Sequence, residues 1–131
     1  MYIIKEFEKE YNKKINDFII SILVDEYGFE KCRLVLENED NSSYIKKNGK
    51  FWIALDEDDN IIGTIVIFKH NNEYMEIKKF YVRNDYRGKG VSKELYNKAI
   101  DFCKEMSFEK IFIGTYDKLE RAIQFYLNKR I

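Results

Sequence analysis

The stretch Met75-Glu76-Ile77-Lys78-Lys79-Phe80-Tyr81-Val82 and the segment Arg87-Gly88-Lys89-Gly90-Val91-Ser92 that soon follows it decide the fold of this chain. The first predicts an apolar β-strand, and the amphipathic residues from Val91 to Met106 predict a helix that begins directly after the glycines. Glycines let the backbone come close to a ligand, and the first turn of a helix carries amide N–H groups without an acceptor inside the helix. Because the helix dipole also favours negative charge there, the sequence predicts a site for a phosphate-bearing ligand.

The segments before this unit predict antiparallel strands with a helix beside them. A short strand is expected over Tyr2 to Phe7. A helix is expected where apolar residues from Ile15 to Leu23 recur at spacings of three and four. Two β-rich runs, Phe51 to Leu55 and Ile61 to Phe68, flank the polar segment Asp56 to Asn60 and predict a hairpin.

The remaining segments complete the order of elements. The segment Cys32 to Lys50 is ambiguous, because its apolar residues Leu34 to Leu36 fit either a strand or a helix. Lys110 to Tyr116 predicts a further strand, which should run parallel to the strand Met75 to Val82 because a helix joins the two. A closing helix is expected from the spacing of Leu119, Ala122, Ile123 and Tyr126.

These elements predict an α/β (α+β) fold with one domain over residues 1–131. Its mixed sheet would have antiparallel N-terminal strands, a parallel β-α-β unit and helices on both faces. Since nothing in the sequence covers the outer edge of the strand Lys110 to Tyr116, we expect a homodimer that shields this edge.

Composition limits the classes of partner and the location. The 23 Lys and Arg residues balance the 23 Asp and Glu residues, which argues against a nucleic-acid or membrane-surface protein. Cys32 and Cys103 are far apart in the sequence and are expected to be free thiols, typical of the cytoplasm. Cys103 falls on the apolar face of the predicted helix and is expected to be a small buried residue. No run is long enough to span a bilayer. The acidic cluster Asp56 to Asn60 lacks the Gly and Glu that a calcium loop requires, so no metal is expected.

The glycine segment fits neither of two common phosphate motifs. No Gly-Lys pair is followed by Ser or Thr at the spacing of a P-loop, and Lys93 stands where a dinucleotide fingerprint has its third Gly. Arg87 to Ser92 instead resembles the acetyl-CoA pyrophosphate loop of the GNAT superfamily of N-acetyltransferases, whose pattern is [QR]-x-x-G-x-[GA]. The strand from Phe80 is similar to the strand before that loop, and Ala122-Ile123-Gln124-Phe125-Tyr126 resembles the later A-x-x-[FL]-Y helix of the family.

The chain departs from the family pattern at three places. Ser92 replaces a usual Gly or Ala, and Leu119 stands where the family often has Asn. After Tyr126 only five residues follow, Leu127 to Ile131, so we expect the C-terminal strand pair of the family to be missing, truncated or supplied by a partner.

The resemblance implies transfer of an acetyl group from acetyl-CoA, used as a cosubstrate without metal, to an amine of a small molecule or peptide. It implies that the main chain of Phe80, Tyr81 and Val82 pairs with pantetheine, and that the Val82 amide is the oxyanion donor. The pyrophosphate would be bound by the amides of Gly88, Lys89, Gly90, Val91 and Ser92, with Arg87 and Lys89 as positive charges. Tyr126 would be the general acid and Glu76 the base, directly or through water.

Alternatives to these roles remain at this point. Tyr126 could be a core residue, and Glu76 could be a surface carboxylate paired with Lys78. From the two-residue period of a strand, Glu76 is expected on the same face as Val82. His70, the single histidine, is expected in an exposed loop. A GNAT-like protein that binds acetyl-CoA without turnover is the main alternative function, and RNA binding is a weaker one. The acceptor amine cannot be predicted from the sequence.

Overall fold

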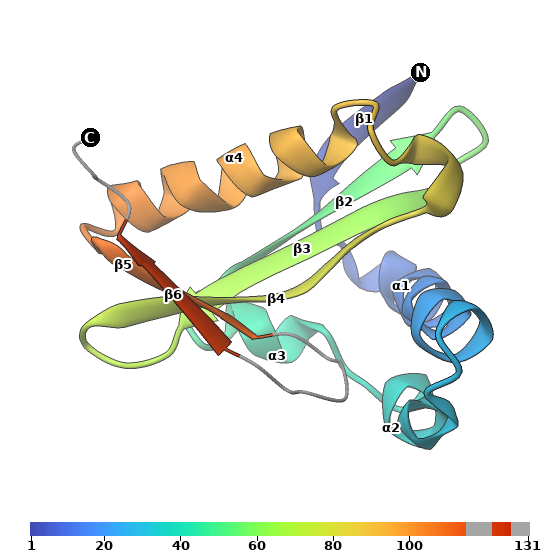
Figure 1. Cartoon of the computed structure of the whole chain (residues 1–131), viewed down its shortest axis with the longest axis horizontal. Helices are drawn as coiled ribbons and strands as arrows, with labels where there is room; N and C mark the ends of the chain where they lie inside the picture. The colour runs from blue at the N-terminus through green and yellow to red at the C-terminus, as the bar shows by residue number, and fades with distance from the viewer. Residues whose placement is uncertain (115–121, 127–131) are drawn as a thin grey trace.

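A mixed sheet of six strands, in the order β1-β2-β3-β4-β5-β6, forms the centre of the molecule (Figure 1). The computed structural model describes residues 1–114 and 122–126, and for 114 and 122–126 it describes the backbone. The strands are β1 (Tyr2–Glu6), β2 (Lys50–Asp56), β3 (Ile61–Lys69), β4 (Tyr74–Val82), β5 (Lys110–Gly114) and β6 (Ala122–Tyr126). Neighbouring strands are antiparallel except β4 and β5, which are parallel as the sequence predicts.

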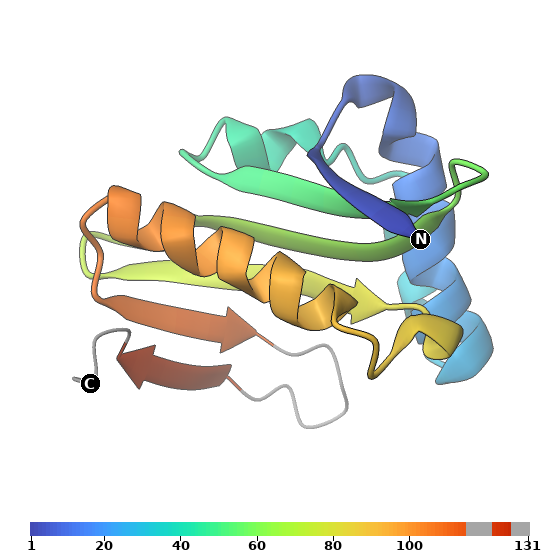
Figure 2. The same ribbon diagram turned by 90° about the horizontal axis from the view of Figure 1, so that it is seen from above.

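Helices cover both faces of the sheet, as expected. The long helix α4 (Val91–Glu105) lies on one face, and α1 (Asn12–Ile20), α2 (Arg33–Glu37) and α3 (Ser42–Ile45) lie on the other (Figure 1). Figure 2 shows α4 lying obliquely over the middle of the sheet, where it packs on β2, β3 and β4. The short turns are η1 (Lys9–Tyr11), η2 (Ser21–Glu26), η3 (Glu30–Cys32) and η4 (Asn84–Tyr86), of which η2 is a π-helical turn that extends α1. Among the described residues, no helix is both long and apolar enough to cross a bilayer.

Each face of the sheet has its own apolar core. The core under α4 contains Met75, Ile77 and Val82 of β4 together with Val91, Leu95, Ala99 and Cys103 of the helix. The core on the α1 side contains Ile15 and Ile19 together with Phe51, Ile53 and Phe68 of the sheet. Burial of Cys103 confirms its expected role as a small apolar residue, and the same burial raises the pKa of its thiol to about 11.

The ambiguous segment between residues 32 and 50 is helical. Arg33–Glu37 and Ser42–Ile45 are short helices, so Leu34 to Leu36 lie in a helix and not in a strand. Leu36 is buried whereas Leu34 and Val35 are exposed, which is the one-sided pattern of a surface helix.

The prediction of a closing helix is wrong for residues 122–126, the part of it that the structure describes. Ala122–Tyr126 is strand β6, which pairs antiparallel with β5 from Lys110↔Tyr126 to Gly114↔Ala122, whereas Leu119 lies outside the described residues. The spacing of a short apolar run cannot separate a helix from a strand, and Ile, Phe and Tyr fit strands well. Pairing with β5 also satisfies backbone groups at an otherwise open edge. The argument for a dimer from that edge is therefore wrong, because β6 of the same chain covers it.

Strand β4 contains a bulge that changes which face its residues occupy. The register with β3 runs Val66↔Lys78 and then Thr64↔Tyr81, so two residues of β4 lie opposite one residue of β3. Lys79, in this bulge, has a φ of 52°, in the left-handed region that residues with side chains rarely adopt. Its carbonyl accepts a 2.7 Å hydrogen bond from the Thr64 hydroxyl.

Two glycines allow close approaches that a methyl group would prevent. A Cβ on Gly63 would lie 2.9 Å from Leu95 Cδ1, at the point where α4 packs on β3. A Cβ on Gly49 would lie 2.4 Å from the Ile67 carbonyl oxygen and 2.6 Å from that of Tyr44, which are backbone atoms.

We expect Gly49→Ala to cost more stability than Gly63→Ala. At Gly63 a flexible Leu side chain can move aside, so the loss should be about 1–2 kcal/mol, whereas at Gly49 the backbone itself must shift and the loss should exceed about 3 kcal/mol. Urea unfolding of the two variants measures both values. Equal losses, or a larger loss at Gly63, would contradict this account of the packing.

Candidate active site

The loop between β4 and α4 is shaped by two glycines in left-handed conformations. Gly88 has a φ of 78° and Gly90 a φ of 91°, and Gly90 directly precedes the first residue of α4. Only Gly adopts such angles without steric cost. At Gly88 a Cβ would meet nothing within 4 Å, so the conformation itself, and not crowding, requires glycine there.

The first turn of α4 presents amide groups without a capping side chain. No side chain caps the helix at Gly90, and its first backbone bond runs from the Glu94 N–H to the Gly90 carbonyl over 3.1 Å. The amides of Val91, Ser92 and Lys93 therefore have no acceptor within the helix. Val91 is fully buried in the core and anchors the turn, whereas Ser92 and Lys93 are exposed. This turn can accept an anion.

The backbone of Val82 faces the side of β5. The Arg83 N–H donates to the Ile62 carbonyl over 2.8 Å, so Arg83 and Ile62 form a hydrogen-bonded pair of the antiparallel ladder between β4 and β3. Because such pairs alternate, the next residue, Val82, points its N–H and C=O away from β3. The parallel register of β4 with β5 covers Tyr74 to Ile77 in the described residues, so Val82 lies beyond it.

The guanidinium of Arg87 is hydrogen-bonded to two other groups of the protein. Its Nε donates to the Val82 carbonyl over 2.8 Å, and its terminal nitrogens bind the Glu26 carboxylate at 2.8 and 3.2 Å. This pair raises the pKa of Arg87 and lowers the pKa of Glu26. Arg87 therefore joins the loop to the end of η2, and its charge is already paired. Lys89 is exposed, with its ammonium 5.8 Å from the centre of the Tyr86 ring.

The side chains of Phe80 and Tyr81 fix β4 between the two cores. Phe80 packs on the α4 side, where its ring stacks on Tyr96 with 6.1 Å between centroids, and Tyr81 packs on the α1 side. Their side chains are thus used for packing, which leaves main-chain groups of this part of β4 as the means of contacting a ligand.

Glu76 lies on the opposite face of the sheet from Val82, which corrects the expectation that they share a face. Val82 belongs to the core under α4, whereas Glu76 lies directly opposite Phe68, a residue of the other core. The extra residue in the bulge shifts the alternation by one, which a count along the sequence cannot detect. This change of face affects the side chain of Val82 and not its amide, because backbone N–H groups of a strand point within the plane of the sheet. The Val82 amide is therefore still available to a ligand.

The partner of Glu76 is His70 and not Lys78. Glu76 is only 9% exposed, and its Oε1 lies 3.0 Å from His70 Nδ1. His70 directly follows β3 and is exposed, as the sequence predicts. Its contact with Glu76 was not predicted from the sequence. The signal was available, because a hairpin at Asn71-Asn72 brings residues 70 and 76 close together.

Tyr126 is not brought toward Val82 by the described backbone. It ends β6 opposite Lys110, and Lys110 lies opposite Tyr74 at the start of β4. Eight residues of strand separate Tyr74 from Val82, which is roughly 25 Å. The role of Tyr126 as a general acid, which the resemblance to the family implies, stays a prediction.

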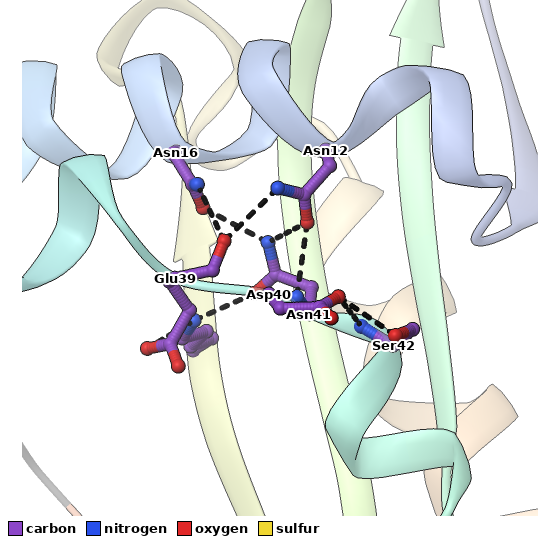
Figure 3. A network of polar contacts seen from close by, with 7 residues as sticks. Asn12, Asn16, Glu39, Asp40, Asn41 and Ser42 are labelled. Atoms are coloured by element: carbon purple, nitrogen blue, oxygen red, sulfur yellow. Dashed lines mark hydrogen bonds and ion pairs between the residues drawn. The ribbon is translucent and has the colours of Figure 1, made fainter.

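A buried polar network at the bulge was not predicted (Figure 3). Lys79 Nζ donates to Asn41 Oδ1 over 2.7 Å and to Glu39 Oε1 over 3.1 Å. Asn41 in turn donates to Asn12 and Asn16 of α1 over 2.8 and 2.9 Å, and both of these donate to the Glu39 carbonyl. The network joins the α2–α3 connection to α1 and to β4. Its one signal in the sequence is the i, i+4 spacing of Asn12 and Asn16.

Comparison with known proteins identifies the family to which this fold and glycine loop belong. The model of the acetyltransferase (GNAT) family matches residues 16–130. The chain belongs to the GNAT family. A GNAT acetyltransferase structure from Staphylococcus aureus Mu50 superposes with a TM-score of 0.78 at 32% identity, over 91% of this chain and 76% of that one.

Two further proteins differ in how much of the chain they match. Streptothricin acetyltransferase A of Bacillus subtilis (strain 168) is 37% identical over 84 residues, which are 64% of this chain and 49% of that protein. The chain thus spans about half the length of this relative. A predicted acetyltransferase from Clostridium acetobutylicum, solved with acetyl-CoA, shares the fold with a TM-score of 0.72 at 21% identity, over 92% of this chain and 84% of that one.

The left-handed glycine before α4 provides a test of the GNAT loop. We expect Gly90→Ala to weaken the binding of coenzyme A at least tenfold in calorimetry, because either the loop changes shape or the alanine is strained by about 1–2 kcal/mol. Gly28→Ala is the matched control, since Gly28 has a φ of 76° and open space around it but lies at the end of η2. Equal affinities of the two variants would contradict the role of Gly90.

The Lys79 network provides a second test. Burial lowers the pKa of Lys79, and its bonds to Glu39 and Asn41 compensate for the loss of hydration. Lys79→Met removes these bonds and keeps a side chain at a positive φ, so we expect a loss of about 2–4 kcal/mol.

Lys79→Gly removes the same bonds but relieves the backbone strain. In urea unfolding it should therefore be about 1 kcal/mol more stable than Lys79→Met. The reverse order would show that the left-handed conformation of Lys79 is not a source of strain.

Proposed function

We propose that this GNAT protein transfers the acetyl group of acetyl-CoA to a primary amine of a small molecule or peptide by direct attack of the amine. One observation gives the main support for this proposal. The uncapped first turn of α4 lies directly after the part of β4 whose Val82 backbone faces outward along the sheet. Phosphate groups and an amide-containing arm on one ligand match these two features, and coenzyme A has both.

The binding roles follow from the chemistry of these groups. The amides from Gly88 to Ser92 donate to the pyrophosphate, and the dipole of α4 adds to the attraction. Lys89 supplies positive charge from the exposed side of the loop. Main-chain groups of Phe80 and Val82 pair with the amides of the pantetheine arm in the manner of an added strand, whereas by the same alternation the main chain of Tyr81 points toward β3. Arg87 fixes the carbonyl of Val82 and so contributes chiefly to the shape of the loop.

The bound cosubstrate supplies a thioester: the amine first forms a C–N bond to the carbonyl carbon, the C–S bond then breaks, and the sulfur leaves as the thiolate of coenzyme A, which takes up a proton from water. The Val82 amide donates to the thioester oxygen while that oxygen gains negative charge. Glu76 removes a proton from the incoming ammonium, because only the neutral amine is a nucleophile. Six positions of strand, or about 20 Å, separate Glu76 from Val82, where the thioester is placed, so this proton travels through water.

Turnover with a panel of acceptors tests the proposal. The panel contains streptothricin, an aminoglycoside, spermidine and a lysine-containing peptide, and release of the coenzyme A thiol is measured with a colorimetric thiol reagent. Cys32 and Cys103 are both buried, so the protein adds little background to this assay. We expect turnover with at least one acceptor and a loss of kcat of about 100-fold or more for Glu76→Gln.

Glu73→Gln is the matched control for the same hairpin, because Glu73 is exposed and pairs with Lys110 over 3.5 Å. Its kcat should stay within about twofold of the natural protein. Binding of acetyl-CoA without turnover on any acceptor would favour the alternative of a non-catalytic acetyl-CoA-binding protein. A lack of measurable affinity for coenzyme A would exclude both.

A further inference from the structure

The carboxylate of Glu76 lies in apolar surroundings. Its neighbours across the sheet are Phe68 on β3 and Phe112 on β5, and directly opposite residues project from the same face. Phe68 is buried in the core on the α1 side, and Glu76 itself is 9% exposed. A carboxylate in such a place needs a hydrogen-bond donor to satisfy its oxygens and to keep one orientation.

His70 is placed to be that donor. Its Nδ1 lies 3.0 Å from Glu76 Oε1, and its ring meets Phe112 edge to face, with 4.9 Å between centroids and an interplanar angle of 82°. The ring is thus held on one side by the carboxylate and on another by an aromatic ring. Its side chain is 39% exposed, so the remainder of the ring lies at the surface.

The backbone beneath His70 is held as well. The N–H groups of His70 and Asn71 both donate to the Tyr74 carbonyl, over 3.0 and 3.2 Å. The Asn71 side chain accepts bonds from the amides of Glu73 and Tyr74, over 2.8 and 2.9 Å. These bonds close the β3–β4 hairpin and determine the position from which the imidazole reaches Glu76.

We propose that His70 is a positioning residue for Glu76, holding one oxygen of the carboxylate through an Nδ1–H bond so that the other oxygen accepts the proton of the acceptor amine. This inference depends on the proposed role of Glu76 as the base. The bond also selects the tautomer of the imidazole, because a carboxylate oxygen can only accept. His70 does not touch the amine or the thioester, and its effect passes through Glu76.

The tautomer of His70 tests the contact without any acceptor. Since the chain has a single histidine, its imidazole signals in a long-range ¹H–¹⁵N spectrum need no assignment. We expect the neutral imidazole to carry its proton on Nδ1 in the natural protein and to shift toward the Nε2–H form, which free imidazole side chains prefer, in Glu76→Ala. A natural protein that already shows the Nε2–H form would overturn the proposal.

Steady-state kinetics test the role, with the best acceptor of the panel above. His70→Ala should lower kcat about 10- to 100-fold and leave the affinity for coenzyme A in calorimetry unchanged. His70→Asn places an amide N–H close to the position of Nδ1 and should restore kcat to within about fivefold of the natural value. Asn72→Ala, at the exposed tip of the same hairpin, is the control and should have no effect.

A double variant separates this proposal from the one on which it depends. If His70 acts through Glu76, then His70→Ala combined with Glu76→Gln should be no slower than Glu76→Gln alone. Additive losses, or a His70→Asn variant as slow as His70→Ala, would overturn the positioning role while leaving Glu76 as the base. Full activity of Glu76→Gln would instead overturn the base itself, and the positioning role with it.

Discussion

The left-handed conformation of Lys79 determines on which face of the sheet the residues of each half of β4 lie. Before the bulge, alternate residues of β4 place Met75 and Ile77 under α4 and Glu76 on the other face. After the bulge, Phe80 and Val82 occupy the α4 side. The strand therefore keeps an apolar row beneath α4 along its whole length, and it still presents the Glu76 carboxylate on the opposite face. A regular strand of the same sequence would have placed Glu76 and Val82 on one face.

The strain of that conformation is compensated by buried polar contacts. Lys79 is tied to the connection between α2 and α3, and through Asn41 to α1. Because every member of this network has partners, it fixes the α1 side of the sheet relative to the bulge with little freedom. The same contacts connect α1 and the α2–α3 connection to the strand on which the cosubstrate is proposed to bind.

The sequence predicted those parts of the fold that depend on local rules. The hairpin at Asp56–Asn60, the glycine loop and α4 were predicted because turn residues, spacing and the helix start all agree there. The bulge was not predicted, since nothing in Lys78-Lys79-Phe80 marks a left-handed residue. The strand β6 was not predicted either, because its apolar spacing fits a helix and only pairing with β5 favours a strand. In the site, the loop residues followed from the sequence, whereas the His70 contact and the Lys79 network depend on how distant segments meet.

The pairing of Arg87 with Glu26 has a consequence for the stability of the glycine loop. Glu26 ends the helical segment that extends α1, and Arg87 opens the glycine loop, so a single ion pair joins these two elements. The shape of the loop therefore depends on a residue 61 positions earlier in the sequence, and a substitution in that helical segment can alter the anion site without contacting it.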